Sequence, residues 1–65
     1  MKINSIKIKL LLAERGMNQT VFSVKCGISR QNLSTILLRG TCSAVTAGRL
    51  AKALGVPVAE IVKEE

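Results

Sequence analysis

The stretch QTVFSVKCGISRQNLSTI, from Gln19 to Ile36, constrains the fold more than any other part of the chain. Its apolar residues recur at helical spacing on both sides of one glycine, Gly27. Glycine tolerates a positive φ, so this position suits a tight turn between two helices. Ile28 would fill the angle between them. The stretch therefore predicts two crossed helices, about 19–26 and from Ser29 onward, that share one apolar core.

Start and stop signals around this unit predict further helices. A first helix over about 4–15 would end at Gly16, which suits a helix C-terminus. A fourth would begin at residue 43 or 46 and end with Leu54. Pro57 suits the first position of a short last helix over about 58–63. The segment from Leu38 to Thr41 is expected to be a loop.

Side-chain caps and an aliphatic core complete this interpretation. Asn18 and Ser29 are placed to accept backbone N–H groups of the first turns of the second and third helices. Phe22 is the only aromatic residue, so the core must be mainly aliphatic. The expected core residues are Ile8, Leu11, Phe22, Cys26, Ile28, Leu33, Ile36, Ala47, Leu50, Ala51, Leu54 and Ile61, with Ile3, Leu12 and Val58 as further candidates. The chain is predicted to be one all-α domain over residues 1–65.

The charge of the chain is strongly positive. Ten Lys and Arg residues face four acids, of which Glu60, Glu64 and Glu65 stand at the C-terminal end. A basic body with an acidic tip fits a surface that binds a polyanion. It equally fits a solvated surface that keeps the protein soluble, so charge alone does not decide the partner.

The residue types argue against several other classes of function. His and Asp are absent, and Cys26 and Cys42 cannot form a zinc ligand set between them. We therefore expect neither a metal, a cofactor nor an enzymatic activity. The apolar run from Leu10 to Ala13 is too short for a signal peptide or a membrane span. A cytoplasmic location is expected.

Together these features resemble the phage repressor and Cro type of helix-turn-helix domain, also called the XRE-like family. The resemblance covers about Ile8 to Val62. It implies a compact five-helix, lambda-repressor-like DNA-binding domain whose second and third helices form the helix-turn-helix. The residues that carry it are Gly16, Asn18-Gln19, Gly27-Ile28-Ser29-Arg30, Leu33, Ile36, Arg39-Gly40 and the run from Leu50 to Val56.

The resemblance also implies DNA-contacting residues. Arg30 and Gln31 match the positions that most often read base edges, and Thr35 matches a third. Arg can pair with the O6 and N7 atoms of guanine, and Gln with the N6 and N7 atoms of adenine. Asn32 and Ser34 are further base-reading candidates. The phosphate-binding candidates are Asn18, Gln19, Ser29, Arg39 and Thr41, each of which also suits a plain cap, first-turn or loop position.

The chain departs from the family at two places. Family members often carry an Arg late in the first helix and a Glu late in the third, and Leu12 and Leu37 occupy the matching positions. An apolar pair can replace a buried ion pair without loss of stability, so we expect these side chains to pack together. The loop also differs, because Leu37-Leu38-Arg39-Gly40 stands where Glu-Asn-Gly is common.

Several apolar residues are left over by the predicted core of a single copy, and these are Val24, Leu38, Val45, Val58 and Val62. Exposed apolar surface on a small domain often marks a partner site. The family commonly binds two half-sites as a two-fold dimer. A homodimer through Val58, Ile61 and Val62, on a palindromic operator in double-stranded DNA, is therefore expected.

Three functions are compatible with the sequence. The first is a sequence-specific transcriptional regulator, of the repressor kind found in prophages and mobile elements. The second is an antitoxin-like protein-interaction module on the same fold, which a tight complex with another protein would favour. The third is a cationic membrane-active peptide, which the glycine-punctuated helices argue against and which helicity in plain water would test.

Overall fold

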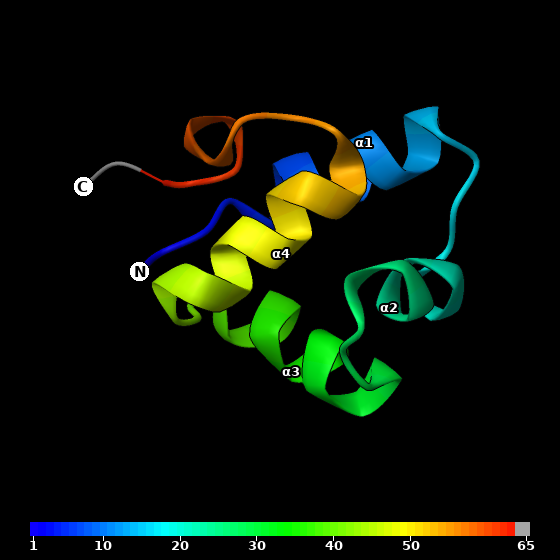
Figure 1. The fold of residues 1–65 in the computed structure, drawn as a ribbon, viewed down its shortest axis with the longest axis horizontal. Helices are drawn as coiled ribbons and strands as arrows, with labels where there is room; N and C mark the ends of the chain where they lie inside the picture. Colours follow the sequence, from blue (N-terminus) through cyan, green and yellow to red (C-terminus); the bar gives the residue numbers. More distant parts are fainter. Residues whose placement is uncertain (64–65) are drawn as a thin grey trace.

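The computed structural model describes residues 1–63, which form α-helices followed by one 3-10 turn (Figure 1). The elements are α1 (Ser5–Glu14), α2 (Gln19–Cys26), α3 (Arg30–Arg39), α4 (Ala44–Leu54) and η1 (Val58–Glu60). The all-α prediction is confirmed. The fifth helix predicted over 58–63 is wrong, since only the η1 turn forms there.

Each α-helix begins at a residue whose side chain accepts a backbone N–H of the first turn. Asn18 Oδ1 accepts from Val21 N at 2.8 Å, and Ser29 Oγ accepts from Asn32 N at 3.1 Å, as predicted. Asn4 caps α1 and Ser43 caps α4 in the same way. These caps place the starts of the helices by local chemistry alone.

The third helix is longer than predicted. The predicted loop from Leu38 to Thr41 is wrong in its first half, because α3 continues to Arg39 and ends at Gly40, whose φ is 71°. Leu and Arg are good helix formers, so nothing in this run stops the helix before a residue that favours the left-handed conformation. The loop between α3 and α4 is therefore short.

The core lies where the four α-helices and the C-terminal segment meet. Phe22, Ile8, Leu33, Leu50 and Ile61 are its largest fully buried side chains. The other predicted core residues are buried or packed against it, except Val58, which is 41% exposed.

Leu12 and Leu37 occupy the same core. Both are almost fully buried and belong to one apolar cluster, and their direct contact stays a prediction. Two charged groups at these depths would carry a large cost of desolvation.

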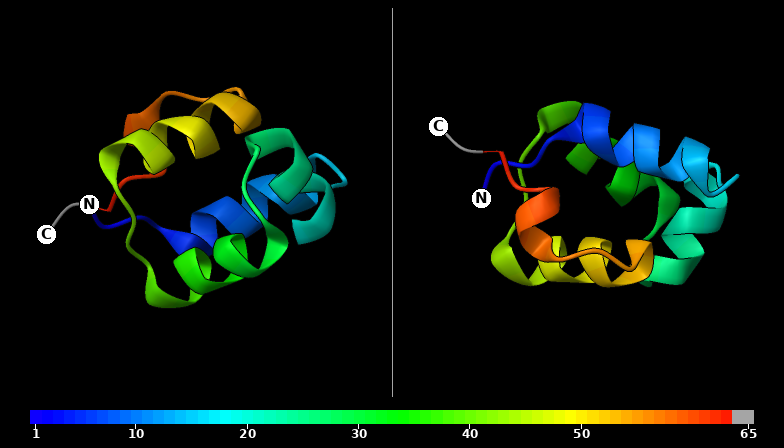
Figure 2. Two further views of the ribbon diagram at one scale, coloured as in Figure 1. Left: turned by 60° about the horizontal axis from the view of Figure 1, so that its bottom comes forward. Right: turned by 90° about the horizontal axis from the view of Figure 1, so that it is seen from above.

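The first four residues form an extended arm that no part of the sequence analysis predicted. Lys2 forms an antiparallel bridge with Thr41, and Ile3 forms another with Val62. The arm thus lies between the loop after α3 and the C-terminal segment, as both views in Figure 2 show. Lys63 N donates to Lys2 O at 3.0 Å, so the chain after η1 pairs with the arm instead of continuing as a helix.

The arm contributes to the core as well. Ile3 is 2% exposed, and its backbone N–H donates to Gly40 O at 3.0 Å. Asn4 N donates to Ile61 O at 2.7 Å. Within residues 1–63, no helix has the length and apolar character that crossing a membrane requires.

Candidate nucleic-acid interface

The turn between α2 and α3 sets the angle at which α3 is presented. Gly27 ends α2 in the left-handed conformation, with φ 71° and ψ 29°. Ile28 N donates to Ser23 O at 3.1 Å, which closes the turn against the end of α2. Ser23 is buried, and its hydroxyl donates to Thr20 O at 2.7 Å. This small side chain with a satisfied hydroxyl lets the two helices approach closely.

The first turns of α3 present polar side chains to solvent. Arg30, Gln31, Asn32 and Ser34 are all exposed, while Leu33 between them is fully buried. Arg30, Gln31 and Ser34 also line one shallow depression on the surface. The structure therefore brings most of the predicted base-reading residues together at the start of one helix.

Thr35 differs from the other base-reading candidates. It is half-buried, and its hydroxyl donates to Gln31 O, one turn earlier, at 3.0 Å. A hydroxyl has a single O–H proton, so the oxygen can now only accept from a base. The other group that this side chain offers is its γ-methyl, which can contact the methyl group of thymine.

Two phosphate-binding candidates keep donors free while they cap helices. The capping bond of Asn18 uses Oδ1, so its amide N–H groups are available to a phosphate oxygen. The capping bond of Ser29 uses an oxygen lone pair, so its O–H is likewise available. Gln19 follows Asn18 as the half-buried first residue of α2. Helix N-termini also carry partial positive charge, which favours an anion.

The two loop candidates differ from each other. Arg39 is exposed at the end of α3. Thr41 is exposed too, but its hydroxyl donates to Met1 O at 3.1 Å. A phosphate bond from this hydroxyl requires that bond to break. The arm that makes this contact carries no strand signal in the sequence, because Lys2, Ile3 and Asn4 alternate over only three residues.

Negative charge is absent from this group of candidates. Among residues 1–63 the acids are Glu14 and Glu60. Glu14 lies 3.9 Å from Arg15, and Glu60 lies 2.7 Å from Lys7. The hydrogen bond from Lys7, together with its charge, lowers the pKa of Glu60. Both acids are thus beside cations outside the predicted contact residues, whose charged members, Arg30 and Arg39, are both basic.

The cysteines give no sign of a reactive or metal site. Burial raises the pKa of the Cys26 thiol to about 11, so it is protonated at neutral pH. Burial also raises the pKa of Cys42. Among residues 1–63, no group of His, Cys, Asp or Glu side chains could hold a metal ion.

The predicted dimer residues are not all accessible. Ile61 is fully buried in the core, so its assignment to a dimer interface is wrong. Val62 is half-buried and bridges Ile3, whereas Val58 is exposed. The predicted exposure of Val24, Leu38 and Val45 is confirmed.

Comparison with known protein families matches residues 7–64 to the Cro/C1-type HTH DNA-binding domain. No curated protein and no solved structure matches the chain. The family match covers α1 from its third residue onward and all of α2, α3 and α4, and it includes every predicted base-reading and phosphate-binding residue.

Proposed function

Because this chain belongs to the Cro/C1-type HTH DNA-binding family, we propose that it is a sequence-specific transcriptional repressor of the kind carried by prophages and mobile elements. One observation supports this proposal above the others. The start of α3 is an exposed polar surface that carries Arg30 and Gln31, and Leu33 beneath it is fully buried in the core. A polar surface supported by a packed core is suited to reading bases.

In this mechanism α3 enters the major groove with its N-terminal end toward the bases. Arg30 donates to the O6 and N7 atoms of a guanine, and Gln31 pairs with the N6 and N7 atoms of an adenine. Asn32 and Ser34 supply further polar contacts from the same turns. Each good bidentate pair discriminates against a wrong base by about 1–3 kcal/mol.

Phosphate contacts fix the register of α3 in the groove. The side chains of Asn18 and Ser29 hold free donors at two helix N-termini, and Gln19 adds an amide beside the first. Arg39 contributes a charged contact from the end of α3. Such contacts add affinity that depends on salt but not on sequence.

The size of the chain favours a homodimer on a palindromic operator. The Cα atoms span 29 × 22 × 17 Å. Successive major grooves on one side of DNA are ~34 Å apart, so one copy reaches one half-site and a second copy reads the other. A bound dimer would exclude RNA polymerase from an overlapping promoter.

Selection from a random DNA duplex library tests this proposal. We expect a palindromic site that binds on the order of 10³-fold more tightly than scrambled DNA. The double variant Arg30→Ala/Gln31→Ala should lose this preference while it keeps the weak, salt-sensitive binding to any sequence.

The matched control is Lys52→Ala, which removes one exposed positive charge from α4. It should keep the preference for the selected site. Equal binding of all sequences by the unmodified protein, or a preference that survives in the double variant, would rule out base reading by α3.

A further inference from the structure

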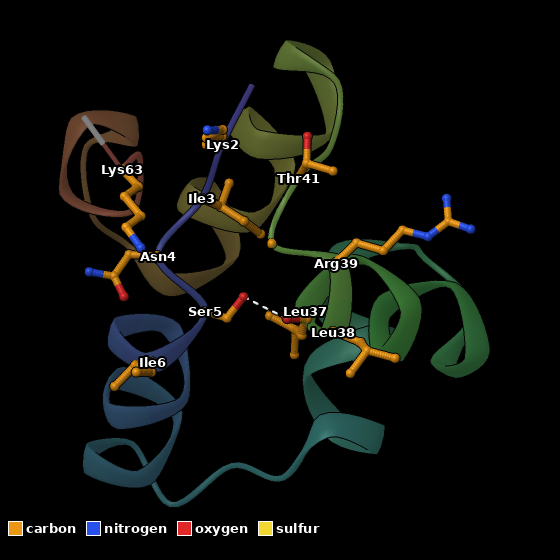
Figure 3. A pocket seen from close by; sticks show the side chains of 11 residues that line it. Lys2, Ile3, Asn4, Ser5, Ile6, Leu37, Leu38, Arg39, Thr41 and Lys63 are labelled. Atoms are coloured by element: carbon orange, nitrogen blue, oxygen red, sulfur yellow. Dashed lines mark hydrogen bonds between the residues drawn. The ribbon is translucent and has the colours of Figure 1, made fainter. Parts of the chain in front are cut away.

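A groove separates the N-terminal end of α1 from the C-terminal end of α3 (Figure 3). It has a volume of about 590 Å³ and is lined by residues 2–6, residues 37–41 and Lys63. Ser5 Oγ donates to Leu37 O at 2.7 Å and ties the two helices together here. The groove therefore lies between elements that this hydrogen bond, the core and the arm connect.

The two sides of the groove carry exposed apolar side chains. Leu38 is 88% exposed on the α3 side, and Ile6 is 73% exposed on the α1 side. Figure 3 shows them on either side of the hydrogen bond between Ser5 and Leu37. Large aliphatic side chains this exposed, flanking one groove, are typical of a surface that binds a partner.

The charged residues that line the groove are all basic. They are Lys2, Arg39 and Lys63, and no acid is among the lining residues. In Figure 3 the side chain of Arg39 extends outward from the α3 side, while that of Lys63 lies beside Asn4. A ligand for this groove must therefore combine negative charge with apolar groups.

These features distinguish among the occupants that such a groove could have. DNA phosphates match the cations but leave Ile6 and Leu38 without apolar contacts. A two-fold pairing of this groove with itself would bring the same cations together, which electrostatic repulsion opposes. An acidic segment with leucine or phenylalanine anchors matches both features.

We propose that this groove is a docking site for an acidic, amphipathic segment of a partner protein. The apolar anchors of that segment pack on Ile6 and Leu38, and its carboxylates face Arg39 and Lys63. Arg39 is also a proposed phosphate contact, so a bound segment competes with the operator; this last step alone depends on the proposed function. Such a partner would release the protein from DNA.

Selection from a random peptide library displayed on phage, with the purified protein as target, tests the docking site in the absence of DNA. We expect the enriched peptides to be acidic and to carry spaced leucine or aromatic anchors. Synthetic copies should bind the protein by fluorescence anisotropy and perturb the backbone NMR signals of residues 2–6 and 37–41.

Two matched variants locate the binding. Leu38→Glu should bind the selected peptide about ten-fold more weakly or worse, whereas Val24→Glu should stay within about two-fold of the unmodified protein. Both change an exposed aliphatic residue to an acid, and Val24, which is 78% exposed on α2, does not line the groove. Leu38→Ala, which removes the apolar anchor without adding charge, serves as a second variant should Leu38→Glu disturb the fold.

Several outcomes would overturn the docking site. These are no enrichment of peptides, enrichment of neutral or basic peptides, or equal weakening by Leu38→Glu and Val24→Glu. A homodimer in analytical ultracentrifugation that Leu38→Glu dissociates would assign the groove to a second copy instead. Operator binding is measured separately on the same variants, so failure of the docking site is distinguishable from failure of the DNA-binding proposal.

Discussion

At the scale of single residues, the direction of one hydroxyl decides what Thr35 can read. Its hydroxyl group donates to Gln31 O, one turn earlier in the helix. The γ-methyl is then the group that can contact the methyl group of a thymine. We expect Thr35→Val, which keeps a γ-methyl, to retain the base preference at that position, and Thr35→Ser to lose it. Binding to operators substituted at each position measures this. The reverse result would show that the oxygen accepts from the amino group of adenine or cytosine.

Cys26 gives a second residue-scale prediction, on stability against pH. Its pKa is about 11 in the fold against 9.0 for an ordinary thiol. Between these values the unfolded chain binds fewer protons than the native one, so the free energy of unfolding falls as pH rises. We expect the loss from this residue to reach roughly 2 kcal/mol by pH 11. Urea unfolding of the unmodified protein and of Cys26→Ala over this pH range isolates the contribution of Cys26. The prediction is contradicted if the free energy of unfolding changes with pH by the same amount in both proteins.

At the scale of elements, two glycines test whether free space or backbone conformation controls the effect of a substitution on stability. An added Cβ meets no atom within 4 Å at either Gly27 or Gly48. Gly48 lies inside α4, so Gly48→Ala should stabilise the protein by about 1 kcal/mol. Gly27 has φ +71°, so Gly27→Ala should destabilise it by about 1–2 kcal/mol. Thermal unfolding measures both, and two shifts of the same sign would show that space, not conformation, controls these positions.

At the scale of the whole molecule, the charge of +6 predicts how binding depends on salt. Arg39→Ala should weaken binding to all sequences and lower the slope of log affinity against log salt by about one. Lys52→Ala should leave the slope unchanged. An unchanged slope for Arg39→Ala would show that Arg39 does not contact DNA phosphates, and its proposed role in the groove would then be the remaining one.

The sequence alone determined the elements whose ends are set by neighbouring residues. Asn18, Ser29 and Ser43 cap helices through bonds that span three positions, and Gly27 ends α2 by its own conformational freedom. Helical periodicity likewise identified most of the core. The family match then agreed with the features visible in these stretches.

Only the tertiary structure decided what depends on segments far apart in the chain. The arm bridges Thr41 and Val62. Through this pairing the Thr41 hydroxyl donates to Met1 O, the chain after η1 pairs with Lys2, and Ile3 is buried. The arm also lines the groove between α1 and α3. Backbone pairing between distant segments leaves little trace in local composition, because any residue except proline supplies the same N–H and C=O groups. Caps and glycine turns, in contrast, require particular side chains, and for that reason they could be read from the sequence.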